Sequence, residues 1–130
     1  MKKLLLIAVA ALGTYTASAQ MTIEGVTVEK SLKVDGKDLT LNGAGLREKF
    51  VFDLYVGGLY TTTKTSNGTA LLSSDQPMAI TLDIVSKLVT QDKMIDAITE
   101  GFEDSVSSAE RKKLQPKIDK FIGFFKKTDS

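Results

Sequence analysis

Residues 47–60, REKFVFDLYVGGLY, carry the longest strand signal in the chain. The apolar side chains of one parity are Phe50, Phe52, Leu54 and Val56. The other parity includes Asp53 and Tyr55. Because successive side chains of a strand point to opposite faces, this alternation predicts one strand from Arg47 to Tyr60 with a core face and a more polar face.

Further strand signals flank this stretch. Residues 26–34 are rich in β-branched side chains, Asp35-Gly36 is a turn signal, and residues 39–41 follow, so the start is expected to form a hairpin or meander. The glycine-rich residues 42–45 are expected to end it. Residues 64–77 are expected to connect strands through one helical turn at Ala70–Ser73, and residues 78–85 alternate as a half-buried strand.

The period then changes from two to 3.6. Thr90 is a candidate N-cap, and the apolar stripe after it is Met94, Ile95, Ile98, Gly101 and Phe102. Ser107 and Glu110 have the spacing of a capping box, whereas Pro116 is expected to open a separate helical segment. Phe121, Phe124 and Phe125 are expected to pack helices together. Strands followed by helices predict an α+β fold, an antiparallel sheet with helices on one side.

The composition favours binding over catalysis. The 130 residues include no His, Cys or Trp, which excludes His-based triads, thiol nucleophiles, disulfides and Cys/His zinc sites. We expect no metal and no cofactor. The 17 basic and 16 acidic residues are interspersed, so a nucleic-acid partner is not expected either.

Residues 1–19 have the organisation of a secretory signal. Lys2-Lys3 precede an apolar run over residues 4–12, and Ala17-Ser18-Ala19 supplies small residues before Gln20. The run is shorter than the about 20 residues that span a bilayer, so cleavage after Ala19 is expected. Residues 20–130 should then form one domain in the periplasm or outside the cell, without an integral membrane segment.

Arg47 and Tyr55 are the candidate binding residues. A guanidinium offers a fork of donors to a carboxylate, and a phenol on the same parity adds another donor. The alternative is that both side chains merely cover the sheet. Eight residues of straight strand span roughly 26 Å, so one ligand reaches both only if the strand bends or bulges.

The segment LNGAGLREKF at residues 41–50, continued by VFDLYVGGLY, resembles the opening of the chalcone isomerase-like family, most closely its secreted bacterial branch. The resemblance runs on through residues 78–85, TQDKMIDAITEGF at 90–102, and the helix around 114–121. It implies a curved antiparallel sheet against a layer of helices, with a hydrophobic cleft between them. The plant enzymes of the family cyclise chalcones to flavanones, and other branches bind fatty acids or have no assigned activity.

The resemblance also assigns residues. The family arginine falls on Arg47, and the tyrosine of the fatty-acid-binding branch falls on Tyr55, where plant enzymes carry a catalytic threonine. The tyrosine and asparagine of the plant enzymes fall on Met94 and Gly101, which lack their polar groups. The segment between Arg47 and Tyr55 is shorter than in plant enzymes, and the chain is expected to hold only the N-terminal portion of the fold.

The leading hypothesis is a secreted, non-catalytic binder of a small apolar carboxylate such as a fatty acid. Arg47 and Tyr55 would meet the anion, and the expected cleft residues are Phe52, Leu54, Met94, Ile98 and Phe102. The alternatives are an isomerase of the chalcone type, which is an intramolecular lyase, and a structural envelope protein in which Arg47 serves the fold.

Overall fold

The computed structural model describes residues 20–127, so the expected leader at residues 1–19 lies outside the described residues. The elements in chain order are β1 (Met21–Ile23), β2 (Val26–Val28), β3 (Ser31–Val34), β4 (Lys37–Lys49), β5 (Phe52–Thr61), α1 (Gly68–Ser73), β6 (Met78–Ile84), α2 (Gln91–Ser105) and α3 (Ser108–Phe125). The predicted α+β class is confirmed.

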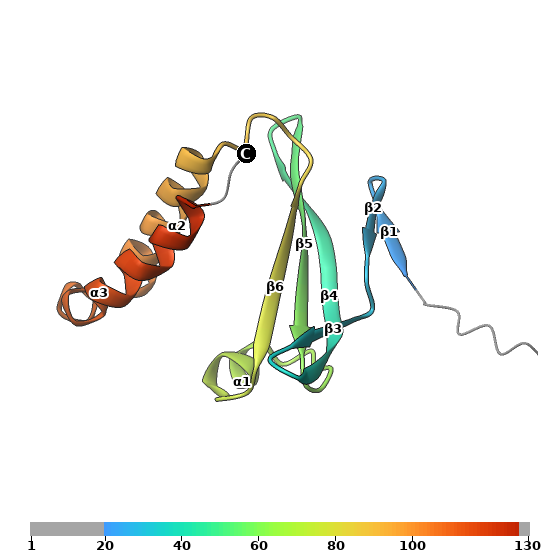
Figure 1. The fold of residues 1–130 in the computed structure, drawn as a ribbon, viewed down its shortest axis with the longest axis horizontal. Coiled ribbons are helices and arrows are strands. Elements are labelled where there is room, and N and C mark those ends of the chain that lie inside the picture. The colour runs from blue at the N-terminus through green and yellow to red at the C-terminus, as the bar shows by residue number, and fades with distance from the viewer. Residues whose placement is uncertain (1–19, 128–130) are drawn as a thin grey trace, which may run out of the picture.

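The strands form two antiparallel units. β3, β4, β5 and β6 pair in that order as a four-stranded meander, and β1 and β2 form a separate hairpin. The meander is curved, with α2 and α3 on one side of it and the β1–β2 hairpin on the other (Figure 1). This is the predicted arrangement of an antiparallel sheet with helices on one side.

The turn predicted at Asp35-Gly36 joins β3 to β4, with φ angles of 48° and 75°. Glu24-Gly25 repeats this pattern between β1 and β2, with φ angles of 46° and 78°. Two positive φ angles in succession belong to type I′ turns, whose twist matches that of the strands they join. Both hairpins at the start of the chain therefore have ordinary tight turns.

The break expected at residues 42–45 is wrong, because β4 continues through them to Lys49. The register instead shifts at Asn42: Leu41 pairs with Tyr60, whereas Gly43 pairs with Leu59. Such a bulge lets a strand bend without ending. The Asn42 Oδ1 atom accepts a hydrogen bond from the Thr65 amide at 2.7 Å, which fixes the connection after β5.

The single strand expected over residues 47–60 is also wrong. Lys49 pairs with Phe52, so Phe50 and Val51 form a two-residue turn and the stretch folds back on itself as the β4–β5 hairpin. Phe50 has a φ of 58°, and its side chain is 91% exposed rather than part of the core. A positive φ at the first turn residue alone fits a type II′ turn, in which glycine is the usual residue.

The main core lies on the sheet face turned toward the β1–β2 hairpin. Its buried side chains are Val28, Leu39, Leu41, Val56 and Tyr60. The Tyr60 hydroxyl donates a 2.8 Å hydrogen bond to the Glu29 carbonyl, which satisfies the polar end of this ring. Val56 is therefore a core residue as predicted, whereas Phe50, Phe52 and Leu54 lie outside this core.

The opposite sheet face is turned toward the helices. β6 is confirmed as a strand, but it contributes Ala79 to the core, while its larger apolar side chains lie on the helix side and are exposed: Met78, Ile80, Leu82 and Ile84. Their cross-strand partners on β5 include Tyr55, Gly57 and Leu59. One face of the sheet thus holds the core, and the apolar side chains of β6 on the other face are exposed.

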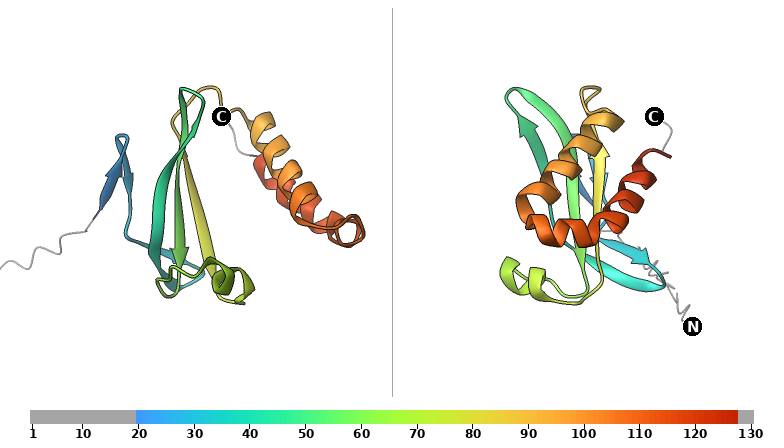
Figure 2. Two further views of the ribbon diagram at one scale, coloured as in Figure 1. Left: turned by 180° about the vertical axis from the view of Figure 1, so that it is seen from behind. Right: turned by 90° about the vertical axis from the view of Figure 1, so that its left-hand side faces the viewer.

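The helices begin where their caps predict. The Thr90 side chain accepts from the Lys93 amide at the start of α2. At the start of α3 the Ser107 hydroxyl accepts from the Glu110 amide, as in a capping box, and donates to the Glu110 carboxylate. The two helices pack side by side as a hairpin (Figure 2), and Ile118 is the buried residue of α3. Between residues 20 and 127, neither these helices nor α1 has the length and apolarity to cross a bilayer.

The separate segment expected from Pro116 is wrong, because Pro116 lies inside the continuous helix α3. A proline within a helix removes one backbone hydrogen bond, and the rest of the helix is retained by its packing against α2. The rings of Phe121 and Phe125 lie 5.3 Å apart at 77°, a contact within α3 itself rather than between two helices. Phe124 is exposed.

Candidate functional site

The β4–β5 hairpin brings the two candidate binding residues together. Arg47 on β4 is the direct antiparallel partner of Tyr55 on β5. Side chains of such partners leave the sheet on the same face, with Cβ atoms about 4.5–5.5 Å apart. The separation of a straight strand therefore does not apply, because the turn at Phe50 and Val51 places both donors at one site.

A second bulge determines which side chains accompany them. The register shifts at Leu54, since Arg47 pairs with Tyr55 and Glu48 pairs with Asp53. The extra residue changes the parity of β5 at this point, so Phe52, Leu54 and Tyr55 all border the same cavity. The carbonyl of Leu54 accepts from the amides of Val85 and Ser86, which joins the bulge to the end of β6.

The cavity lies between the end of this hairpin and the first half of α2, and its volume is about 560 Å³. This is within the range of about 300–1,000 Å³ that small-molecule sites occupy. The residues that line it are Arg47, Lys49, Phe50, Phe52, Leu54, Tyr55, Leu88, Val89, Lys93, Met94, Ala97 and Glu100. Most of the lining is apolar, and the polar groups sit at a few positions.

The structure gathers five of the seven predicted site residues at this cavity. Arg47, Tyr55, Phe52, Leu54 and Met94 border it, whereas Ile98 and Phe102 are half-buried on another side of α2. The helical period explains the difference. At about 100° per residue, Lys93, Ala97 and Glu100 fall on one face of α2, and Ile98 and Phe102 lie more than a quarter turn away from it.

The charges of the lining favour an anion. Arg47, Lys49 and Lys93 contribute three cationic groups, and Glu100 contributes one carboxylate. Within residues 20–127, Lys33 and Asp38 form an ion pair at 3.7 Å in the β3–β4 hairpin, away from this cavity. Arg47, Lys49 and Lys93 form no ion pair with a carboxylate of these residues. Lys49 and Lys93 were not among the predicted site residues. The signals that point to them are the shared parity of Arg47 and Lys49 and the helical spacing of Lys93 and Glu100.

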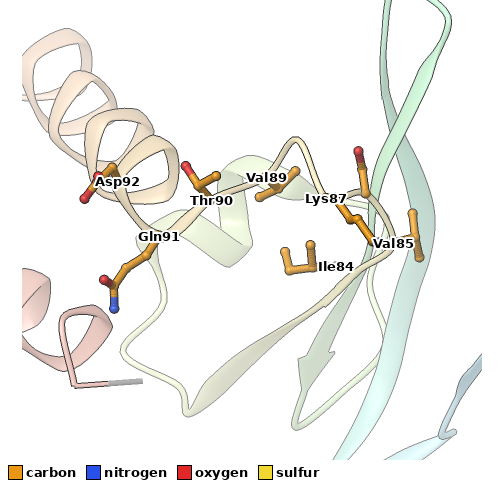
Figure 3. Close-up of a pocket in the computed structure, with 8 residues that line it drawn as sticks. Ile84, Val85, Lys87, Val89, Thr90, Gln91 and Asp92 are labelled. Carbon is orange, nitrogen blue, oxygen red and sulfur yellow. The ribbon is translucent and has the colours of Figure 1, made fainter. Parts of the chain in front are cut away.

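A neighbouring hollow of about 570 Å³ lies along the link between β6 and α2 (Figure 3). Its lining comes from one continuous segment, residues 84–92 without Leu88, and its side chains point in different directions along that segment (Figure 3). It lacks a pair of convergent donors. The cavity at Arg47 and Tyr55 is therefore the better candidate site.

The donors at this cavity suit recognition more than proton transfer. A guanidinium, a phenol and two ammonium groups can donate hydrogen bonds to an anion, whereas Met94 brings no hydrogen-bond donor to the cavity. Between residues 20 and 127 no group of three acidic side chains is arranged to hold a metal ion. The residues that line the cavity are therefore suited to bind an apolar molecule that carries a negative charge.

Comparison with known proteins agrees with this architecture. The family model described as chalcone isomerase-like matches residues 20–130, which is most of the chain. Searches among curated proteins and among solved structures gave no match. The match covers both walls of the cavity, from the β4–β5 hairpin to α2. This chain is a member of the chalcone isomerase-like family.

Proposed function

We propose that the protein is an exported, non-catalytic binder of a small apolar carboxylate such as a fatty acid. The observation that carries the proposal is the pairing of Arg47 with Tyr55 at the wall of a largely apolar cavity, where the arginine forms no ion pair with a carboxylate of residues 20–127. A carboxylate ligand would supply that counter-charge. Its chain would lie against Phe52, Leu54 and Met94.

The leader at residues 1–19 supports the assignment to the periplasm or the exterior. An apolar carboxylate is poorly soluble in those compartments, so a carrier has a physical task there. The cavity of about 560 Å³ is large enough for an acyl chain of medium length.

The isomerase alternative receives less support from the site. General acid–base and orienting groups contribute typically about 10²–10⁴-fold to a rate, and the positions of the plant donors hold Met94 and Gly101. We therefore expect chalcone cyclisation to proceed at the uncatalysed rate in the presence of the protein. A saturable rate that disappears in Arg47→Ala would support the enzyme instead.

Mass spectrometry of bound small molecules tests the proposal. Protein purified from its own compartment should release a fatty or other apolar carboxylate on denaturation, and Arg47→Ala purified in parallel should release much less. Leu72→Ala is the matched control, because Leu72 is an exposed side chain on α1 outside the cavity. Equal yields from all three proteins, or no carboxylate from the wild type, would contradict the proposal.

A further inference from the structure

One end of the molecule presents apolar side chains that the fold does not use. The turn residues Phe50 and Val51 are 91% and 87% exposed, and Phe52, Val85 and Leu88 at the same end of the sheet are also exposed. Phe50, Phe52 and Leu88 border the same cavity, so the hairpin turn and the β6–α2 link meet there. We call these five residues the tip surface. It lies at the end of the sheet opposite to α1 (Figure 1).

Three aspects of the turn distinguish the tip surface from ordinary exposed apolar residues. Phe50 and Val51 are consecutive and project from a tight two-residue turn, where polar residues and glycine are usual. Phe50 adopts a φ of 58°, which is unfavourable for a bulky side chain. No side chain of the main core touches this end of the hairpin, since the core cluster ends at Val56 and Leu46.

Cationic residues predominate in the chain segments that lie at this end of the molecule. The start of α2 and the end of α3 lie close together, because the Gln91 side chain donates a hydrogen bond to the Phe125 carbonyl. We count charges in four segments, which are the hairpin end (47–53), the link (85–90), the first turn of α2 (91–93) and the end of α3 (125–127). Their cationic residues are Arg47, Lys49, Lys87, Lys93, Lys126 and Lys127. The acidic residues of the same segments are Glu48, Asp53 and Asp92. The cationic residues thus outnumber the acidic ones two to one.

We propose that the tip surface docks on a lipid bilayer that carries anionic headgroups. Phe50, Val51 and Leu88 would enter the interface, where apolar side chains leave water, and the lysines would meet the phosphates. This arrangement fits a bilayer better than a folded protein partner, because two adjacent apolar side chains on a narrow turn enter a soft interface but cover little area on a rigid one.

The docking also fits the cavity. Phe50 and Phe52 belong both to the tip surface and to the cavity wall, so a docked molecule would hold the edge of its cavity against the bilayer. An apolar carboxylate would then pass between bilayer and cavity with little exposure to water. This consequence rests on the proposed function, whereas the docking itself rests on the exposed residues and charges alone.

Sedimentation with vesicles tests the docking without any added ligand. The full chain after leader removal is mixed with vesicles of phosphatidylcholine, with or without phosphatidylglycerol. The wild type should bind the mixed vesicles more tightly. Val51→Ser should lower that affinity about tenfold, since a buried valine contributes on this scale and Val51 does not line the cavity. Leu72→Ser, which changes an equally exposed side chain on α1, should bind as the wild type does.

The electrostatic part has its own variant. Lys87→Gln should lower affinity for the mixed vesicles roughly fivefold and leave affinity for phosphatidylcholine alone unchanged. Phe50→Gly, which keeps a residue suited to the turn, should weaken binding to both vesicle types. A thermal melt of each variant confirms that the fold is retained.

The outcomes separate this proposal from the proposed function. No vesicle binding by the wild type, or equal binding by Val51→Ser and Leu72→Ser, would overturn the docking. Loss of self-association in Val51→Ser, with vesicle binding unchanged, would also overturn it by assigning the tip to contacts between copies. Vesicle binding together with no carboxylate binding in solution would support the docking and contradict the proposed function alone.

Discussion

At the scale of single residues, Phe50 combines an unfavourable backbone conformation with an exposed ring. Its φ of 58° is a left-handed conformation that costs an ordinary residue about 1–2 kcal/mol, and its exposed ring has few packing contacts to lose. We predict that Phe50→Gly raises the free energy of unfolding by about 0.5–1 kcal/mol, after the higher flexibility of glycine in the unfolded chain is taken into account. Urea unfolding of the two proteins measures this. Destabilisation by Phe50→Gly would show that the ring supports the fold.

Arg47 and Lys93 line the cavity from different elements, one from β4 and one from α2. Arg47 has a direct strand partner in Tyr55, whereas Lys93 sits on an exposed helix face. A flexible ammonium attracts an anion but fixes its geometry less than a guanidinium does. We predict that Lys93→Gln weakens carboxylate binding less than Arg47→Ala does, and that added salt reduces the difference between Lys93→Gln and the wild type. Titrations at low and high salt check both statements.

At the scale of elements, the boundaries were predicted correctly where a turn or capping motif marks them and poorly where no such motif is present. Asp35-Gly36, Thr90 and the Ser107–Glu110 box carry recognisable signals, and each marks the boundary expected of it. The turn at Phe50-Val51 has no glycine, asparagine or proline, so local chemistry indicates a continuous strand. Tertiary pairing between Arg47 and Tyr55 overrides that local preference.

The same reason limited the prediction of the site. Arg47 and Tyr55 were identifiable by residue type and by resemblance, but their proximity depends on the turn at Phe50 and Val51, which no turn motif marks. The cavity side of α2 was assigned from its apolar stripe, whereas Lys93, Ala97 and Glu100 on the adjacent face line the cavity. An amphipathic pattern predicts which side chains of a helix are buried, but it does not predict whether they pack against a second helix or line a cavity.

Pro116 gives a prediction for α3. It is exposed within the helix, where proline is about 3 kcal/mol less favourable than alanine. We predict that Pro116→Ala raises the free energy of unfolding by about 1–3 kcal/mol and leaves ligand binding unchanged, because residue 116 does not border the cavity. Chemical denaturation together with a ligand titration checks both parts. An unchanged or lower stability would mean that α3 needs a bend at this position.

At the scale of the whole molecule, the two faces of the sheet have different roles. The face toward β1 and β2 holds the main core, and the face toward the helices combines the cavity with the exposed apolar row of β6. The packing of α2 and α3 is mainly with each other. The helix-facing side is therefore expected to be the more mobile one, since few buried contacts hold it.

The exposed row of β6 leads to a prediction about association. Ile80 is 71% exposed, and in residues 20–127 β6 is the edge of its sheet, with β5 as its neighbour. Exposed apolar edge strands recruit other chains. We predict that residues 20–130 self-associate at micromolar concentration and unfold over a broad range, and that Ile80→Lys reduces the association whereas Leu72→Lys does not. Light scattering with size-exclusion chromatography decides it. A clean monomer with a sharp melt would contradict the prediction.

The central claim is that Arg47 and Tyr55 act together on a carboxylate at the apolar cavity. Calorimetric titration with a medium-chain fatty acid tests it most directly, with the wild type, Arg47→Ala, Arg47→Lys and Tyr55→Phe compared under one set of conditions. Charge-assisted hydrogen bonds contribute roughly 1.5–3 kcal/mol and neutral ones about 0.5–1.5 kcal/mol. We predict the greatest loss of affinity for Arg47→Ala, a smaller loss for Arg47→Lys and the smallest for Tyr55→Phe. Equal affinities across the four proteins would place the site elsewhere and contradict the claim.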